Sequence, residues 1–299
     1  MRFPVYFLRH RIIKLLGLLL LAGVLQACSF VRVAYNQAPE LAYLYLDGYV
    51  DFNGTQSILI KDELAKLQAW HRQTQLPLYV DTLQKFQRQI PSTMEATQAC
   101  ELFADVRYKL LAVSDYAEPA VLALAGSLSP EQLTRMERKF AKGNADYVDD
   151  FIEAAPKASR NKRYKQAVSR AEMLYGSLGD KQLDVIGQSI DQSRVDARLL
   201  YSERLRRQRD ALESLRLLAA SKSAGTDTLE KTRTVVRALF DRSLNSPSPA
   251  YREQLEKMTL DACKNFAGLH NSTTPAQRAR AVENLKGYEL DFKALIAKN

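Results

Sequence analysis

Glycine and proline are scarce in this sequence, which contains 12 glycines and 10 prolines among 299 residues. No stretch alternates polar and apolar residues for long enough to predict a strand, and the turn residues that β-sheets need are few. The composition also argues against disorder, because 46% of the residues are hydrophobic and 26% are charged. We therefore expect an all-α protein that buries a sizeable core.

The common motifs of catalysis and nucleotide binding are also missing. The sequence contains no Gly-rich phosphate loop, no Gly-x-Ser-x-Gly turn and no His-Glu-x-x-His helix. Asp47, Asp51 and Asn53 are spaced like the start of a calcium loop, but the glycine and the closing glutamate of an EF-hand are not in place. We expect turn and capping roles for these residues, and we predict that the protein is not an enzyme.

Histidine, a common metal ligand, occurs three times in the chain. His10 lies in the N-terminal segment, and His71 and His270 are far apart in the sequence. In the run Trp70-His71-Arg72 we expect the end of a helix, where a cationic side chain complements the helix dipole. A site with two His ligands would require both helices to meet, so we predict no metal.

The N-terminus has the pattern of a secretion signal. Residues 1–14 carry four basic residues and no acid, and an apolar run follows from Leu15 to Leu25. A permanent transmembrane helix would need about 20 apolar residues, whereas this run is bounded by Lys14 and Gln26. We predict that residues 1–27 are a signal peptide that is removed on export.

The block Leu25-Gln26-Ala27-Cys28 resembles the lipobox of bacterial lipoproteins. The resemblance implies that the Cys28 thiol receives a diacylglycerol, the only covalent group that we expect and the means of membrane attachment. In such lipoproteins an Asp after the cysteine favours the inner membrane, and this sequence has Ser29 instead. We therefore expect the periplasmic face of the outer membrane.

Net charge gives little support to a nucleic-acid partner. The formal charge is +9, and subtracting the four basic residues of the signal peptide leaves +5. Two basic stretches remain, and we expect both to be mostly solvated faces, with contact to an anionic ligand as the alternative. They comprise Lys157, Arg160, Lys162, Arg163, Lys165 and Arg170, and then Arg194, Arg198, Arg204, Arg206, Arg207 and Arg209.

Cys100 and Cys263 are the cysteines left after Cys28. In an oxidising compartment such a pair is more often bridged than free, so we predict a Cys100–Cys263 disulfide. The alternative is two thiols packed in the core.

Apolar residues recur every three or four positions from Asn53 onward, which indicates amphipathic helices. The most regular stripe is Leu133, Met136, Phe140, Asn144, Tyr147 and Phe151, in which we expect Asn144 to hydrogen-bond internally. Breaks are predicted at Leu76-Pro77 and Pro119, among others. We expect eight or more helices in one domain, residues 53–299, preceded by a lipidated, tyrosine-rich segment, residues 28–52, that docks on the core or lies at the membrane.

Several predicted helices begin with a capping residue followed three positions later by glutamine. The cap oxygen accepts from the backbone N–H of the glutamine, whose side chain accepts from the N–H of the cap. The boxes are Asn53 with Gln56, Ser129 with Gln132, and Thr274 with Gln277, and degenerate copies occur at Gly179 with Gln182 and Glu95 with Gln98.

Two resemblances follow from these motifs. Leu128-Ser129-Pro130-Glu131-Gln132 resembles the Leu-Thr-x-x-Gln motif of small periplasmic helical chaperones of the Spy and CpxP group, although ordinary capping would also produce it. The chain also resembles an uncharacterised family of Gram-negative putative outer-membrane lipoproteins. The matching points are Cys28-Ser29, residues 31–37, residues 46–51, Trp70-His71-Arg72, and the Ser129 and Thr274 boxes.

These features predict a membrane-anchored, periplasm-facing lipoprotein that binds partners or unfolded clients without catalysis. One alternative is a structural or assembly factor that recognises an envelope protein through Tyr35 to Tyr49. A third is an enzyme acting on envelope polymers, which would require Asp47 or Asp51 to meet another acid in a cleft.

Overall fold

The computed structural model describes residues 30–225 and 228–297, and all regular elements within them are helical. The predicted all-α array of eight or more helices is therefore confirmed. The elements are α2 (Phe30–Val50), α3 (Gly54–Trp70), the π-helical turn η1 (His71–Gln75), α4 (Leu76–Gln89), α5 (Ala96–Ala125), α6 (Pro130–Phe151), α7 (Pro156–Tyr175), α8 (Asp180–Asp191), α9 (Ala197–Ser223), α10 (Leu229–Leu244), α11 (Pro249–Ser272) and α12 (Pro275–Ile296).

Helix starts follow the local signals in the sequence. Proline occupies the first turn of α4, α6, α7, α11 and α12, where its missing N–H needs no helical partner. Side chains of Asn53, Ser129 and Thr274 accept the backbone N–H three residues on. Asp51 precedes the first of these caps with a φ of 61°, which lets the chain reverse between α2 and α3.

One expected helix break, at Pro119, is wrong. Pro119 lies inside α5 and does not break it, because its side of the helix is exposed and water can replace the lost hydrogen bond. The run Trp70-His71-Arg72 does mark the end of α3, which lies at Trp70. The chain then continues without a loop through η1 into α4. The expected break at Leu76-Pro77 is therefore a helix boundary, at which π-helical winding changes to α-helical winding.

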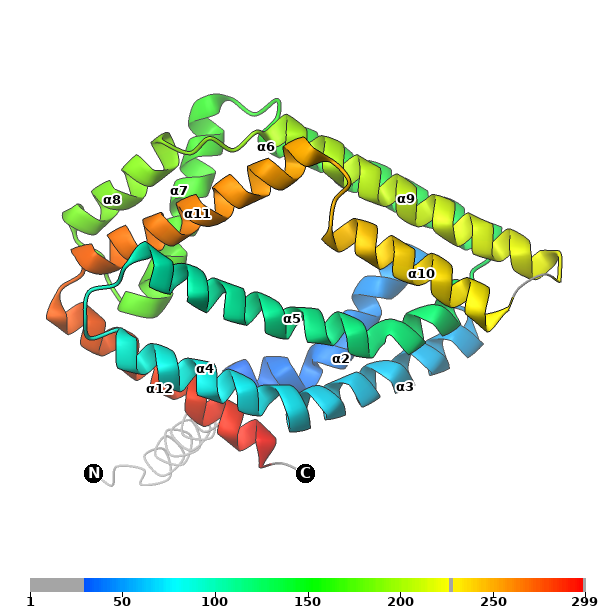
Figure 1. Cartoon of the computed structure of the whole chain (residues 1–299), viewed down its shortest axis with the longest axis horizontal. Coiled ribbons are helices and arrows are strands. Elements are labelled where there is room, and N and C mark those ends of the chain that lie inside the picture. Colours follow the sequence, from blue (N-terminus) through cyan, green and yellow to red (C-terminus); the bar gives the residue numbers. More distant parts are fainter. Residues whose placement is uncertain (1–29, 226–227, 298–299) are drawn as a thin grey trace, which may run out of the picture.

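The helices form two halves with matching internal packing, which we call the N-terminal half (α2–α6) and the C-terminal half (α7–α12). In the first half, α2 packs on α3 and α6, and α3 packs on α5. In the second half, α7 packs on α8 and α12, and α8 packs on α11. Figure 1 shows the halves as related by an approximate twofold rotation, with α2 and α3 opposite α7 and α8. Helix α10 has no counterpart in the first half.

The halves interlock through exchanged helices. Helix α4 of the first half packs on α12 of the second, and α9 of the second packs on α6 of the first. These two contacts form opposite edges of the molecule, while α5 and α11 pack against each other between them (Figure 1). Each half therefore supplies a helix against which a helix of the other half packs.

Burial is divided among three apolar clusters. The largest joins α4, α5, α7, α11 and α12 around Ile90, Ala99, Tyr175 and Ala281. Smaller clusters join α5, α9 and α10, and then α2, α6 and the residues between α5 and α6. The predicted disulfide between Cys100 and Cys263 lies in the largest cluster, where it joins α5 to α11 across a Cα–Cα distance of 5.2 Å.

The tyrosine-rich helix α2 packs on the body, where it contacts α3, α6 and α12. Val50 at its end is buried with Leu128 and Leu133. Within residues 30–225 and 228–297, no helix combines the length and the apolar character needed to cross a bilayer. The predicted signal peptide, residues 1–27, and Cys28 lie outside the described residues.

Candidate functional site

The first two capping boxes are docked on each other. Gln56, buried at the start of α3, donates from Nε2 to the carbonyl oxygen of Ser127 at 3.0 Å. Gln132, at the start of α6, donates from Nε2 to the carbonyl oxygen of Asp51 at 3.0 Å. The two side-chain amides also bond each other reciprocally, at 3.1 and 2.7 Å. Each glutamine thus accepts from the capping residue of its own box through its side-chain oxygen, and donates through Nε2 to the backbone just before the other box.

The C-terminal half repeats this arrangement between α8 and α12. Gln182 donates from Nε2 to the carbonyl oxygen of Ser272 at 2.6 Å, and Gln277 donates to that of Ser177 at 2.9 Å. The amide of Gln277 also lies 3.4 Å from the Gln182 side-chain oxygen. In each of the four cases the accepting carbonyl belongs to the residue two positions before the other box's capping residue. The box at Gly179 has no capping side chain. Its one side-chain hydrogen bond runs from the Gly179 N–H to the Gln182 side-chain oxygen.

Capping was predictable from the sequence, whereas the pairing was not. A glutamine three residues after a cap needs its side-chain oxygen for the cap, which leaves both Nε2 hydrogens available for other acceptors. The fifth box shows that pairing is not automatic. Gln98 accepts from the Glu95 N–H, and the neighbouring Met94 backbone is held by the Asn271 side chain at 2.9 Å on both its N–H and its carbonyl.

Both exchanged helix contacts contain a satisfied polar cluster. Between α6 and α9, Asn144 exchanges two hydrogen bonds with Gln208 and accepts from Arg204 at 2.8 Å. The predicted internal hydrogen bonding of Asn144 is therefore confirmed. Between α4 and α12, the fully buried Glu289 accepts from Gln84 and Gln87. Hydrogen bonds from Lys293, Gln84, Lys286 and Gln87 lower the pKa of Glu289.

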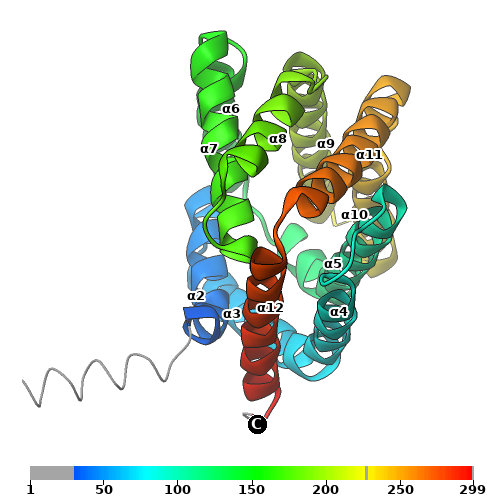
Figure 2. The same ribbon diagram turned by 90° about the vertical axis from the view of Figure 1, so that its left-hand side faces the viewer.

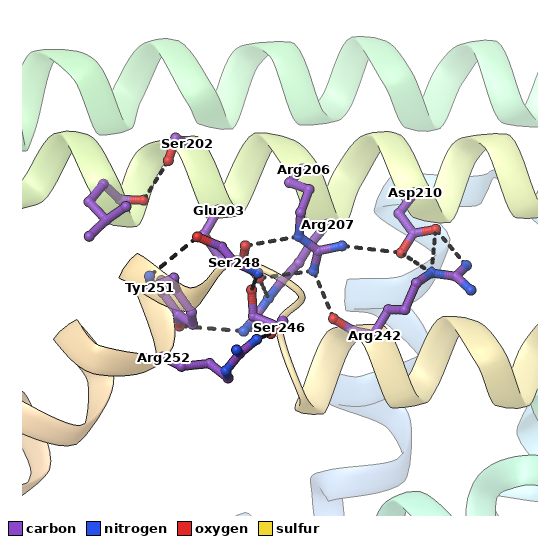
Figure 3. Close-up of polar contacts among 11 residues, drawn as sticks. Ser202, Glu203, Arg206, Arg207, Asp210, Arg242, Ser246, Ser248, Tyr251 and Arg252 are labelled. Carbon is purple, nitrogen blue, oxygen red and sulfur yellow. Dashed lines mark hydrogen bonds and ion pairs between the residues drawn. The ribbon is translucent and has the colours of Figure 1, made fainter.

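A charged network joins α9 to the end of α10 and the start of α11 (Figure 3). Glu203 is buried and accepts from Arg206 and Arg207 at 2.8 to 2.9 Å. Arg242 binds Asp210 with two nitrogens, and Arg206 also donates to the carbonyl oxygen of Arg242 at 2.8 Å. These arginines fix the α9–α10 angle by satisfying buried acceptors.

The electrostatics of this network favour an ionised carboxylate. Burial alone would raise the pKa of Glu203, but hydrogen bonds from Arg206, Arg207 and Ser246 lower it to about 2. Arg204, Arg206 and Arg207 of the second basic stretch are part-buried and are not among the solvated residues of that face. Arg204 donates to Asn144 on α6, and Arg206 and Arg207 donate to Glu203 one turn earlier on α9.

Comparison with known families places this geometry in context. The profile of a family described as a family of unknown function (DUF6279) matches residues 48–234, more than half of the chain. This chain belongs to the DUF6279 family. The match includes the boxes at Asn53, Ser129 and Gly179, and it ends before Cys263 and the Thr274 box. No curated protein and no solved structure matches the chain.

The two histidines within the described part of this DUF6279 chain, His71 and His270, have separate structural partners. His270 is fully buried and donates from Nε2 to the Ser92 carbonyl at 2.7 Å, so its Nδ1 accepts from the Tyr175 hydroxyl at 2.9 Å. Burial lowers the pKa of His270, which favours this neutral ring. His71 bonds the Tyr35 hydroxyl through Nδ1 at 3.0 Å. The described residues contain no group of three or more His, Cys, Asp or Glu that could hold a metal.

The tyrosines of α2 mostly face the body. Tyr35 bonds His71, Tyr43 donates to the Ser57 hydroxyl at 3.1 Å, and the Tyr49 ring contacts Phe140. Tyr45 is the exception, since its side chain is exposed and contacts Tyr49 of the same helix, through both the rings and the hydroxyls. A partner that recognises Tyr35, Tyr43 and Tyr49 together would have to displace these contacts.

The acidic residues at the α2–α3 junction have structural roles, as expected. Asp47 accepts from the Phe52 N–H at 2.9 Å, and Asp51 pairs with Arg135 at 2.9 Å. Asn53 caps α3. The junction thus joins the ends of α2 and α3 to α6, next to the first pair of docked boxes.

Proposed function

We propose that this chain is a lipoprotein, anchored through Cys28 to the periplasmic face of the outer membrane, whose helical body binds unfolded or partner proteins without catalysis. The lipobox-like Leu25-Gln26-Ala27-Cys28 and the basic and apolar segments before it support the anchor. Two or three acyl chains hold a protein at a bilayer without any further surface, because each buried CH₂ contributes about 0.8 kcal/mol.

The observation that carries the binding role is the docked pair of glutamine boxes, which occurs once in each half. Leu128-Ser129-Pro130-Glu131-Gln132 has the form of the Leu-Thr-x-x-Gln motif of the Spy and CpxP group, and Leu178 precedes the Gly179 box in the same way. An isolated capping box is ordinary, whereas four boxes docked in two equivalent pairs are a specific arrangement of helices. On the basis of this resemblance we propose an ATP-independent holding activity.

A partly apolar groove between α5, α10 and α11 has the chemistry that an unfolded client would need. It has a volume of about 330 Å³. Leu244, Leu255 and Leu260 supply apolar wall. Arg107 and Arg252 supply positive charge, which exceeds the single negative charge of Glu256 in the same lining. Unfolded polypeptides expose apolar side chains together with carboxylates, so such a lining suits them broadly without selecting one sequence.

The test is the aggregation of a reduced, unfolded test protein, α-lactalbumin, followed by light scattering in the presence of the full lipidated chain and without ATP. We expect suppression near equimolar ratio. Leu260→Asp, in the groove, should weaken it, because a charge disfavours apolar contacts. Leu290→Asp is the matched control, since Leu290 is similarly exposed but lies on α12 outside the groove.

Failure to suppress aggregation at equimolar ratio would contradict the holding activity. Equal activity of Leu260→Asp and Leu290→Asp would exclude this groove as the client surface. The assembly-factor alternative has less support, because three of the four tyrosines in α2 bond or pack against the body.

A further inference from the structure

Helix α2 has an exposed apolar stripe along its outer face. The side chains of Phe30, Leu41, Leu44 and Tyr45 are 85%, 59%, 55% and 66% exposed. With Val33 they recur at helical spacing over about 22 Å of the helix axis, given a rise of about 1.5 Å per residue. Gln37 is the one polar residue that shares this line.

The opposite face of α2 packs on the body. Tyr35, Tyr43 and Val50 lie on that face and contact α3 or the third apolar cluster. Figure 2 shows α2 on one outer edge of the molecule, with α10 and α11 on the opposite edge. The stripe therefore faces away from the groove between α5, α10 and α11.

No charged side chain interrupts the stripe. Arg32 pairs with Asp291 at 3.1 Å, and Asp47 accepts from the Phe52 N–H, so both point to the body. Glu40 lies on the flank, 3.9 Å from Lys61. An apolar line free of charge can enter a lipid headgroup region without the cost of desolvating an ion.

The position of the stripe in the chain indicates what covers it. Phe30, its first residue, follows Cys28 by two residues, a separation of at most about 7 Å in extended chain. We propose that α2 lies in the plane of the membrane surface, with this stripe inserted among the lipid headgroups. The proposal rests on the lipid anchor at Cys28, which would hold the start of the stripe at the bilayer.

Interfacial chemistry fits this occupant better than a protein partner. The Tyr45 side chain combines an exposed apolar ring with a hydroxyl that donates to the Tyr49 hydroxyl. Such amphipathic rings are favoured at membrane surfaces. A helix with aromatic and leucine side chains on its apolar face typically lies about 5–10 Å deep at the headgroup boundary. This orientation turns α10 and α11 toward the aqueous side, where clients would arrive (Figure 2).

The test measures the depth of a spin label on the full lipidated chain in phosphatidylcholine and phosphatidylglycerol vesicles. The label is attached at Leu44→Cys, with Leu260→Cys on α11 as the matched control, and the native disulfide leaves one reactive thiol in each variant. We expect the ratio of oxygen to nickel-chelate collisions to be several-fold higher at position 44, because oxygen concentrates in lipid and the chelate stays in water.

Equal ratios at positions 44 and 260 would overturn the proposal. Spectral broadening at position 44 that disappears on dilution with unlabelled protein would show a second copy on the stripe, and would also overturn it. The mass of the N-terminal peptide is measured on the same sample. If Cys28 carries no lipid, both the anchor and this orientation fail, whereas a lipidated chain with a water-exposed Leu44 label refutes the orientation alone.

Discussion

At the residue scale, the glutamines three residues after the capping residues join the starts of two helices by hydrogen bonds. Gln56 satisfies the Asn53 N–H, the Ser127 carbonyl and the Gln132 side chain from one buried amide. Removing it leaves several buried groups without partners, which costs more than losing one exposed hydrogen bond. The Gln98 side chain closes its box without such docking and provides the comparison.

Gln56→Ala should lower the free energy of unfolding by about 2–3 kcal/mol, which combines a lost cap with unpaired buried groups. Gln98→Ala should cost about 1 kcal/mol or less. Urea unfolding followed by circular dichroism measures both. Equal losses in the two variants would mean that box docking contributes nothing beyond capping.

Glu203 makes stability depend on pH. Its pKa is about 2 in the folded chain and 4.5 as an ordinary glutamate, so the stabilisation is present above about pH 4.5 and is lost as pH falls toward 2. That difference corresponds to roughly 3 kcal/mol. Glu203→Gln should therefore be less stable at pH 7 and lose less stability between pH 7 and pH 3.

Urea midpoints of both chains across this pH range provide the measurement. Glu253→Gln is the control, because Glu253 is exposed and its salt bridge with Lys257 is at the surface. Parallel acid profiles for wild type and Glu203→Gln would contradict the assigned role of Glu203.

At the element scale, local chemistry explains most helix starts and few of the interruptions. Proline and capping residues identify where α6, α11 and α12 begin, because these preferences act within one turn. Pro119 was predicted to interrupt a helix and does not, whereas α3 ends at Trp70 as predicted but continues into η1 without a loop. Whether a break signal ends a helix depends on exposure and on neighbouring helices, and neither is encoded within a few residues.

The disulfide between α5 and α11 should stabilise the fold by restricting the unfolded chain. Replacing Cys100 and Cys263 by alanine should cost about 2–5 kcal/mol. A reductant should lower the thermal midpoint of the wild type to near that of the double variant and leave the double variant unchanged. Two thiols that react in the denatured chain before any reduction would refute the bridge.

At the scale of the whole molecule, exchanged helices make the halves interdependent. The sequence predicted an all-α body and the start boxes, but not that α4 packs on α12 and α9 on α6. These pairings join residues far apart in the sequence, 205 positions between Gln84 and Glu289 and 64 between Asn144 and Gln208, and periodicity within one helix contains no information about its partner. The docking of the boxes on each other could not be predicted either, because it depends on which helix starts meet in space.

We therefore expect residues 28–153 and 154–299 to be unfolded or aggregated when produced separately, since each lacks the surface that covers α4 or α9. Mixing the two from denaturant should restore helical content and a single complex. Circular dichroism and analytical ultracentrifugation measure both results. A separately folded, monomeric half would contradict interlocking.

The anchor at Cys28 is the central claim, because the compartment, the disulfide and the orientation of α2 all depend on it. Mass spectrometry of the tryptic N-terminal peptide from purified membranes tests it most directly. We predict a peptide from Cys28 to Arg32 that carries a diacylglycerol on the thiol. An unmodified Cys28, or a mature N-terminus at any other residue, would contradict the account.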